Sequence, residues 1–485
     1  MELEDFLRGT AWLTAGQLTA TFIAGLASIA IARILGPSGY GLYSLSISAA
    51  GLLALLSWLG VDQAAVRKAS RDRQSSKQVL DTALTFALLN ALAVAAVGLA
   101  SSQLLAQAVG RPELAATVAL ASLSVALAIP LAAANLLTAV GRADVPAKAG
   151  VALQLLRAAL VPSLALAAGY YGAVTGHSAA YLLAALIALA LYRRATGPWR
   201  PTLTGLRELI SFGAPLWLPG VLSTLVAFAR TAATGQLLGN AEIGALAAAM
   251  NFSALAGVLV TPLSSMALPY ISSSNGGERR ALRHVVRTSA LISAPIAVYT
   301  LLYAEPLVQA IYGEAYSAAA LPLRILALQY LLPLFGSTAL TQYLVARGDN
   351  KTVLKASIAS SLTQLAAIYP LTLSARAPGV AASIILSQAA GLTYTYLKAR
   401  ENAFEPTPLL PALIAALPSL PLLLAGTHPL LKAAAGMAVY TASYILAALA
   451  TGTLTRAEVS TLITALRPAT LKAQPPQHQG HSPVS

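Results

Sequence analysis

Three arginines, Arg157, Arg230 and Arg324, lie inside long apolar stretches of this sequence. Arginine stays protonated in proteins, and its planar guanidinium matches the geometry of phosphate and carboxylate groups. A charged side chain in an apolar span costs on the order of 3 kcal/mol, so it normally faces a water-filled cavity or an oppositely charged partner. Residues 209–238 around Arg230 contain no acidic residue, so no salt bridge can form within that stretch. The arginines therefore predict a cationic site that selects an anion.

Each arginine also has a structural interpretation, in which its long side chain reaches water at the end of the apolar stretch. For Arg324, Glu305 and Glu314 are available as partners near that end. Arg157 lies deeper, but its side chain could reach the surface in the same way. Arg230 lies well inside its stretch, so it is the strongest candidate for direct contact with a ligand.

Uncharged polar residues and prolines could complete the site. Pro215 and Pro219, with Gly213 and Gly220 nearby, predict a bend in the stretch that carries Arg230, because proline removes a helical hydrogen bond. Polar residues within apolar stretches either line a cleft or join helices by hydrogen bonds. The predicted cationic cleft includes Arg33 beside the three arginines, and its candidate polar lining is Gln17, Asn135, Gln154, Asn251, Gln329, Gln342 and Gln364.

The apolar stretches are long enough to cross a membrane. Apolar residues make up 57% of the 485-residue chain and charged residues 10%, against about 25% charged residues in a soluble domain. The mean hydropathy is +0.70. We predict an all-α, polytopic membrane protein with about 14 transmembrane helices. The predicted spans are residues 10–35, 41–61, 79–100, 114–140, 149–170, 174–192, 209–238, 243–271, 286–304, 318–345, 352–374, 379–397, 409–426 and 430–451.

Basic residues concentrate at alternate ends of these spans. Of the 31 lysines and arginines, 24 fall in segments that face the cytoplasm if the first span starts inside, and four fall in the opposite turns. This positive-inside bias predicts a multi-pass protein of the cell (plasma) membrane with both termini in the cytoplasm. Topology and attraction to anionic lipid thereby explain the formal charge of +14 without nucleic acid. The acidic N-terminus lacks the features of a signal peptide, so we expect the first span to be retained.

The pattern of the first half recurs in the second. Leu35-Gly36 is echoed by Leu238-Gly239 at an offset of 203 residues, and Gly141 is echoed by Gly348 at an offset of 207. Such ordered matches indicate an internal repeat. Six spans in each half return the chain to the same side, so the halves form two parallel six-helix repeats around a central cleft. We expect six-helix bundles at residues 1–200 and 201–405, two additional peripheral helices at 406–455, and a cytoplasmic, largely disordered tail at 456–485.

Other kinds of chemistry are excluded or disfavoured by the residues present. The chain has no cysteine, which excludes disulfides, thiolate metal sites and cysteine nucleophiles. Its five histidines are scattered without metal-ligand spacing, and no P-loop, zinc-protease or serine-hydrolase motif occurs. No acidic residue lies deep within a span, although a proton- or sodium-coupled pump usually carries one there. We therefore predict no cofactor, no metal site and no catalytic residue.

Three motifs resemble a known family. The run ARILGPSGYGLY at residues 32–43 resembles the first hairpin of the Wzx-like polysaccharide-biosynthesis flippases. The runs IYGEAY at 311–316 and LRILA at 323–327 resemble the segment that enters their tenth span. This family belongs to the superfamily of multidrug extruders and lipid II flippases, which are built as two six-helix bundles around a cleft. The resemblance implies a flippase that moves a lipid-linked (pyro)phosphate oligosaccharide from the cytoplasmic to the outer leaflet by alternating access.

The partners that the resemblance implies are the lipid-linked oligosaccharide, membrane lipids and glycan-assembly enzymes, with no nucleic acid. Arginines would hold the phosphate and sugar while the lipid tail stays in the bilayer. Two alternatives remain, a MATE-like exporter of small organic solutes and a membrane-bound enzyme of glycan assembly. The absence of deep acidic residues disfavours the exporter, and short outer loops without clustered carboxylates disfavour the enzyme. Activity in liposomes without a sugar donor separates a transporter from an enzyme.

Overall fold

The computed structural model describes residues 3–72, 74–274 and 276–454. Within these ranges the chain forms fourteen α-helices and five short 3₁₀ segments, and no strand. The all-α class predicted from the sequence is confirmed. The tail predicted at residues 456–485 lies outside the described residues.

Each predicted span coincides with helical structure. Nine helical stretches of the described chain are long and apolar enough to cross a membrane. The helices α5 and α12 each contain two predicted spans, and α1 contains the first predicted span and the beginning of the second. The α-helices are α1 (Leu3–Ala50), α2 (Val61–Arg71), α3 (Ser76–Ala108), α4 (Ala115–Ala132), α5 (Asp144–Thr196), α6 (Leu206–Leu237), α7 (Asn240–Gly257), α8 (Thr261–Ser272), α9 (Glu278–Tyr312), α10 (Ala320–Ala327), α11 (Leu340–Ala346), α12 (Asn350–Ala399), α13 (Leu409–Leu424) and α14 (Pro429–Ala450). The 3₁₀ segments are η1 (Gly51–Leu56), η2 (Pro112–Leu114), η3 (Ala133–Val140), η4 (Glu314–Ala319) and η5 (Leu328–Phe335).

Three long helices are interrupted close to the turns predicted between two spans. Gly36 in α1 has φ 64° and ψ 173°, a conformation that glycine adopts without steric cost. The helix α5 breaks at Gly169 (φ 57°, ψ −140°), and α12 breaks at Arg376 (φ 57°, ψ −137°). These two breaks are 207 residues apart and nearly identical in backbone angles. The internal repeat seen in the sequence therefore extends to the backbone.

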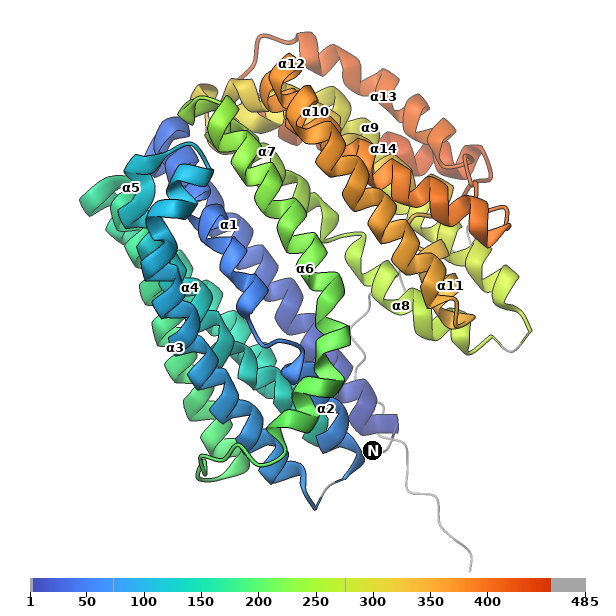
Figure 1. Cartoon of the computed structure of the whole chain (residues 1–485). Helices are drawn as coiled ribbons and strands as arrows, with labels where there is room; N and C mark the ends of the chain where they lie inside the picture. Colours follow the sequence, from blue (N-terminus) through green and yellow to red (C-terminus); the bar gives the residue numbers. More distant parts are fainter. Residues whose placement is uncertain (1–2, 73, 275, 455–485) are drawn as a thin grey trace, which may run out of the picture.

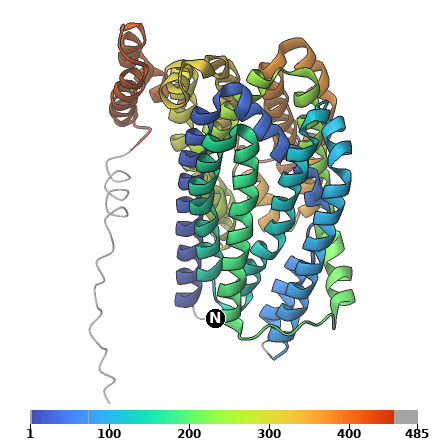
Figure 2. The same ribbon diagram turned by 90° about the vertical axis from the view of Figure 1, so that its left-hand side faces the viewer.

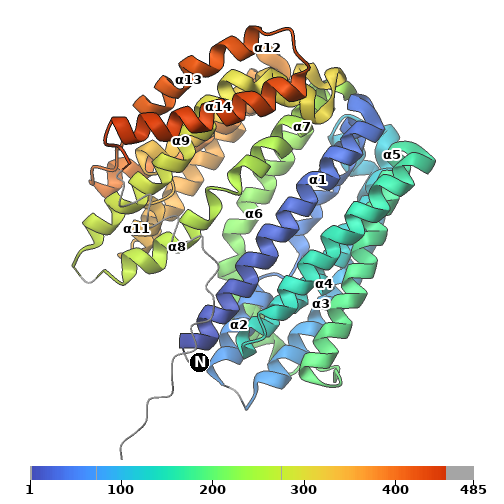
Figure 3. The same ribbon diagram turned by 180° about the vertical axis from the view of Figure 1, so that it is seen from behind.

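The helices form two bundles with a peripheral pair. Figure 1 shows α1 to α5 gathered on one side and α8 to α12 on the other, with α6 and α7 between them. The pair α13 and α14 lies on the outside of the second bundle, next to α9 (Figures 2 and 3). The hydroxyls of Tyr299 and Tyr303 in α9 fasten this pair by donating to the carbonyl oxygens of Ala433 and Ser419, each at 2.6 Å. The predicted repeats and peripheral helices are confirmed.

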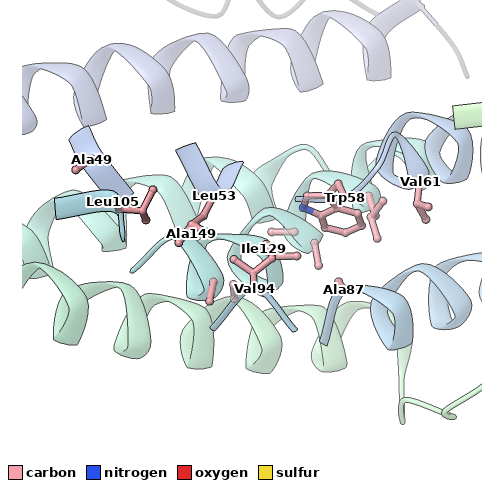
Figure 4. Packing of buried hydrophobic residues seen from close by; sticks show 14 of the residues in the cluster. Ala49, Leu53, Trp58, Val61, Ala87, Val94, Leu105, Ile129 and Ala149 are labelled. Carbon is pink, nitrogen blue, oxygen red and sulfur yellow. The ribbon is translucent and has the colours of Figure 1, made fainter. Parts of the chain in front are cut away.

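Close packing of small and apolar side chains holds the first bundle together. Figure 4 shows Leu53, Val94 and Ile129, from η1, α3 and α4, within one buried cluster. Each of these side chains is at most 5% exposed. Gly98 of α3 lies so close to α4 that an added Cβ would stand 2.5 Å from the Cβ of Ser122. Such small residues let helix backbones approach, which promotes helix association in lipid.

The two halves meet tightly at one end of the bundles. We call this the Gly36 end, because α1 turns there at Gly36, and the opposite end, where Gly60 precedes α2, the Gly60 end. A Cβ added to Gly41 would stand 2.1 Å from the carbonyl oxygen of Asn240, so backbone meets backbone at the Gly36 end. A side chain at this position would force the halves apart.

Hydrogen bonds reinforce the contact at the Gly36 end. Arg33 donates from Nε to the carbonyl oxygen of Ile311 at 2.7 Å and from Nη2 to that of Ala310 at 2.6 Å. These carbonyls end α9 and have no partner further along the helix, so a cation is favourable there. A hydrogen bond in the opposite direction joins the same two regions, since the hydroxyl of Tyr316 donates to the carbonyl oxygen of Ala32 at 2.7 Å. The Gly36 end is therefore closed.

The first part of α6 packs on the first bundle at the Gly60 end. A Cβ added to Gly213 would stand 2.3 Å from the carbonyl oxygen of Gly60. Lys68 of α2 forms an ion pair with Glu208 of α6 at 2.5 Å. This part of α6 therefore belongs structurally to the first bundle, although it follows the boundary predicted at residue 200.

Further along, α6 changes partner. The hydroxyl of Tyr369 in α12 donates to Oε1 of Gln236, near the end of α6, at 2.6 Å. Pro215 and Pro219 lie between the two contact regions, and α6 stays a continuous helix through both. Because α6 touches both halves on either side of these prolines, the hinge predicted there and the boundary at residue 200 stay predictions.

The contact between Gly213 and Gly60 gives a stability test. We expect Gly213→Ala to lower the free energy of unfolding by about 1–3 kcal/mol, because the new methyl group overpacks a backbone contact. Gly220→Ala is the matched control in the same helix, since its Cβ would meet nothing within 4 Å. It should raise the free energy of unfolding by up to about 1 kcal/mol through helix propensity. Thermal unfolding in detergent measures both, and equal effects would contradict this packing.

Candidate functional site

A cavity of about 720 Å³ lies among α6, α7, α8, η5 and α12. Its wall combines one charged side chain, Arg230, with hydroxyls, amides and apolar surface. The polar lining residues besides Arg230 are Ser253, Ser264, Gln329, Tyr330, Ser337, Thr338, Thr341, Ser357, Ser360, Gln388 and Thr395. None of the described lining residues is acidic. The volume is in the range of small-molecule sites, about 300–1,000 Å³.

Arg230 brings an uncompensated positive charge to this cavity. Its side chain is half-buried, and no described residue gives its guanidinium a hydrogen bond or an ion pair. The hydroxyl of Thr234, one turn away, donates to the backbone carbonyl oxygen of Arg230 at 2.7 Å. Five N–H donors of Arg230 are therefore free to bind an anion, including two in parallel.

Two smaller cavities continue the first towards α1 and α5. The second, of about 220 Å³, shares Arg230 and Met250 with the first. The third, of about 260 Å³, shares Ser44, Ser48 and Asn251 with the second. No acidic side chain is among the described residues that line any of the three. Together they form a chain of cavities that reaches from the second half into the first.

Arg157 lies on the wall of the third cavity. Its Nη1 donates to Oε1 of Gln154, one turn earlier in α5, at 3.0 Å. Its Nε is buried and has no hydrogen-bond partner in the described part of the chain. On the same wall the hydroxyl of Tyr43 lies 3.1 Å from Nδ1 of His177. The first half thus contributes a second cation, held in place by neutral polar groups.

A polar bridge joins the halves beside the two arginines. Asn251 of α7 donates from Nδ2 to the hydroxyl of Tyr40 in α1. That hydroxyl lies 2.7 Å from Oγ of Ser28, also in α1. Asn251 therefore contributes to the cavity wall and also to a helix–helix hydrogen bond, the two alternatives that its sequence context leaves open.

The other predicted arginines lie elsewhere. Arg33 is occupied by the α9 carbonyls at the Gly36 end. Nη2 of Arg324 lies 4.0 Å from Oε2 of Glu305, the partner that a surface-reaching side chain would use. Neither lines the three cavities. The structure thus brings Arg230, Arg157 and the partner Gln154 of Arg157 together, and leaves Arg33 and Arg324 outside this group.

Of the predicted polar lining, Gln329 and Asn251 line these cavities, and Gln17, Asn135, Gln154, Gln342 and Gln364 do not. Gln17 and Asn135 are exposed. Gln364 is buried, with its Nε2 lacking a hydrogen-bond partner among the described residues. Their place in a cationic cleft stays a prediction.

Sequence reasoning missed the residues that surround Arg157. Tyr40, Tyr43 and His177 face the third cavity from α1 and α5. The histidine is 5% exposed and lies within an apolar stretch, which is the one signal that could have singled it out. The tyrosines belong to the motif at residues 32–43, where their types suit core packing equally well.

The first cavity extends towards the Gly60 end. Its lining includes Ser264 of α8, Thr341 of α11 and Ser357 near the start of α12. Figure 1 shows α8 and α11 at the same end of the molecule as α2, which follows Gly60. Since the Gly36 end is closed by backbone contacts, an anion reaches Arg230 from the Gly60 end in this conformation.

Comparison with known proteins agrees with this architecture. A family model described as polysaccharide biosynthesis protein matches residues 30–321, more than half of the chain. No curated protein sequence matches the chain.

Solved structures share the fold at low sequence identity. The lipid II flippase MurJ, in an inward closed conformation, superposes with a TM-score of 0.77 at 14% identity, covering 90% of this chain and 97% of MurJ. An inward-facing multidrug resistance MATE family transporter of the MOP superfamily gives 0.57 at 17% identity, covering 80% and 94%. A MOP superfamily transporter from Pyrococcus furiosus, described as having a binding pocket of reverse polarity, gives 0.59 at 17% identity, covering 82% and 94%. The chain thus has the MOP-superfamily transporter fold.

The direction of cavity access can be tested by labelling, because the chain contains no cysteine. We expect Ser357→Cys to react with a membrane-impermeant maleimide added at the Gly60 end and to resist the same reagent at the Gly36 end. Leu362→Cys, an exposed apolar position on the same helix, is the control and should resist both. Gly244→Val should increase labelling from the Gly36 end, since its Cβ would stand 1.9 Å from the carbonyl oxygen of Pro37. Equal labelling of Ser357→Cys from both ends would contradict closure.

Proposed function

Because this chain belongs to the polysaccharide biosynthesis protein family, we propose that it is a flippase for lipid-linked oligosaccharides that carry phosphate or diphosphate. The single observation that carries this proposal is Arg230, a free guanidinium on the wall of an acid-free cavity. An anion in that cavity supplies the counter-charge that the described residues do not. Phosphate is the anion common to lipid-linked glycans, and the arginine fork matches it.

The outside of the bundles suits the lipid part of such a substrate. Large apolar side chains on α6 and α12 are well exposed, for example Leu218 at 64% and Leu373 at 72%. Between the bundles the cavity wall is rich in hydroxyls and amides, which can bind the glycan. A lipid chain can therefore remain in the bilayer while the polar head group crosses between the bundles.

The charge distribution supports an orientation in the cell membrane. With 24 of 31 basic residues in the segments at one side, the Gly60 end is cytoplasmic and both termini lie inside. The closed Gly36 end then faces outward, and the substrate enters from the cytoplasmic leaflet. Release outside requires opening of the Gly36 end while the Gly60 end closes. The bundles at residues 1–200 and 201–405 move relative to each other, with Pro215 and Pro219 in α6 as the bend.

Transport, and not catalysis, fits the residues that face the cavities. No carboxylate pair is among the described lining residues, and the hydroxyl–imidazole pair of Tyr43 and His177 is buried in the wall of the third cavity. The matching family is described as polysaccharide biosynthesis protein, and the similar solved structures include a lipid II flippase. Glycan-assembly enzymes are then partners that deliver or consume the lipid-linked substrate.

A flipping assay tests the proposal. Full-length protein in proteoliposomes should move a fluorescent polyprenyl-diphosphate oligosaccharide between leaflets, measured by protection from an impermeant quencher. We expect Arg230→Ala to reduce the rate at least about tenfold, because charged hydrogen bonds to phosphate are each worth about 1.5–3 kcal/mol. Arg230→Lys should retain part of the rate, since it keeps the charge without the fork.

The matched control is Lys355→Gln, which removes an exposed charge outside the cavities. Its rate should equal that of the unmodified protein. Full activity of Arg230→Ala would make this arginine structural. A folded protein that moves small organic cations but no lipid-linked glycan would instead indicate the MATE-like exporter.

A further inference from the structure

The third cavity holds a permanent cation that phosphate binding at Arg230 leaves unused. No carboxylate among the described residues pairs with Arg157, and none lines this cavity. Nη1 of Arg157 is occupied by Gln154, whereas Nε is buried without a partner. Nε and Nη2 lie on one edge of the planar guanidinium and form the fork that binds two oxygens of a carboxylate or phosphate. The side chain is therefore held by Gln154, with the hydroxyl of Tyr43 beside its guanidinium, and Nε is the donor left without a partner among the described residues.

The position of Arg157 separates it from Arg230. Arg230 lines the first and second cavities, and Arg157 lines only the third. The two phosphates of a diphosphate share one oxygen, so their negative charges lie close together. Both phosphates can therefore bind in the same cavity, at Arg230. A ligand with negative charge at both arginines carries a neutral part between its two charges, and the second cavity, of about 220 Å³, has room for such a part beside Arg230 and Asn251. A sugar residue is a neutral part of this kind.

The wall of the third cavity suits a sugar. Hydroxyls of Ser28, Ser44 and Ser48 and the amide of Asn251 offer neutral donors and acceptors. Tyr40 and Tyr43 add aromatic rings, stacked with their centroids 6.1 Å apart. Sites for small polar ligands combine such apolar ring surface with a few placed polar groups.

We propose that the third cavity binds an acidic sugar of the transported glycan, with the sugar carboxylate on the fork of Arg157. The inference rests on the proposed function and narrows its substrate to an anionic glycan. The lipid-linked phosphate meets Arg230, a neutral part of the glycan crosses the second cavity, and the acidic sugar reaches Arg157. Asn251 then contacts the substrate at the border of the second and third cavities.

The test compares two substrates. One is a fluorescent polyprenyl-diphosphate disaccharide that ends in glucuronic acid, and the other is the same molecule ending in glucose. The unmodified protein should flip the acidic form about tenfold faster, the effect of one charged pair. Arg157→Gln should bring the ratio of the two rates close to one, and Arg157→Lys should give an intermediate ratio. Lys355→Gln should leave the ratio unchanged.

Two outcomes would overturn the inference. The first is a ratio of acidic to neutral flipping rates near one in the unmodified protein, and the second is a ratio that Arg157→Gln does not change. Either result would mean that Arg157 does not bind the sugar carboxylate. Equal slowing of both substrates by Arg157→Gln would assign Arg157 to the diphosphate. Arg230→Ala should slow both substrates alike, which separates the phosphate site from the sugar site.

A binding measurement distinguishes failure of this inference from failure of the flippase function. Thermal unfolding of the full chain in detergent is recorded with free glucuronate and with glucose at equal concentration. Glucuronate should raise the unfolding temperature of the unmodified protein and not of Arg157→Gln, because a ligand stabilises the state that binds it. This shift without any flipping would refute the function and keep the acidic-sugar site. Flipping without the shift or the rate ratio would keep the function and refute the site.

Discussion

A free guanidinium in an acid-free cavity is the constraint on which the rest of this structure depends. Arg230 cannot remain charged in hydrocarbon, so the helices around it must enclose water or an anion. The hydroxyl- and amide-rich wall of the 720 Å³ cavity provides that environment. Because neither this cavity nor its two neighbours is lined by a described acidic residue, their field repels cations and attracts anions. The charge of Arg230, which is costly for folding, is thereby the one that we propose selects the ligand.

The proposed transport adds a second constraint, since alternating access requires the cavity to open to each side in turn. The closed Gly36 end depends on the backbone contact at Gly41 and on Arg33, which donates two hydrogen bonds to carbonyl groups at the C-terminal end of α9. These contacts join α1 of the first half to α7 and α9 of the second half. Because so few helices take part, the contacts can break together when the two halves move apart. The helix α6 touches α2 at one end and α12 at the other. The helix α6 thus connects the two halves, and it contains Pro215 and Pro219, each of which removes a helical hydrogen bond.

Much of the fold could be predicted from the sequence, because hydropathy and loop charge act locally. The spans, the repeat and the peripheral helices α13 and α14 follow from such local signals. Arg230 could be singled out because its position deep in an acid-free apolar stretch is visible in the sequence alone. The location of Arg33 depends on the carbonyl group of Ile311, a partner that only the packed structure reveals, whereas Glu305 could be named from the sequence as a partner of Arg324. The cluster around Arg157 joins residues of α1 and α5 far apart in the chain, and a single sequence carries no information on such pairing.

The central claim is that substrate phosphate binds Arg230, and a structure of the protein with a bound polyprenyl-diphosphate oligosaccharide in a lipid nanodisc tests it most directly. The account predicts phosphate oxygens at about 2.7–2.9 Å from the guanidinium nitrogens of Arg230, the distance of a charge-assisted hydrogen bond. The glycan should extend from there through the cavities that contain Asn251. Phosphate bound to the basic segments at the Gly60 end or to Arg324, with the guanidinium of Arg230 still free, would contradict it.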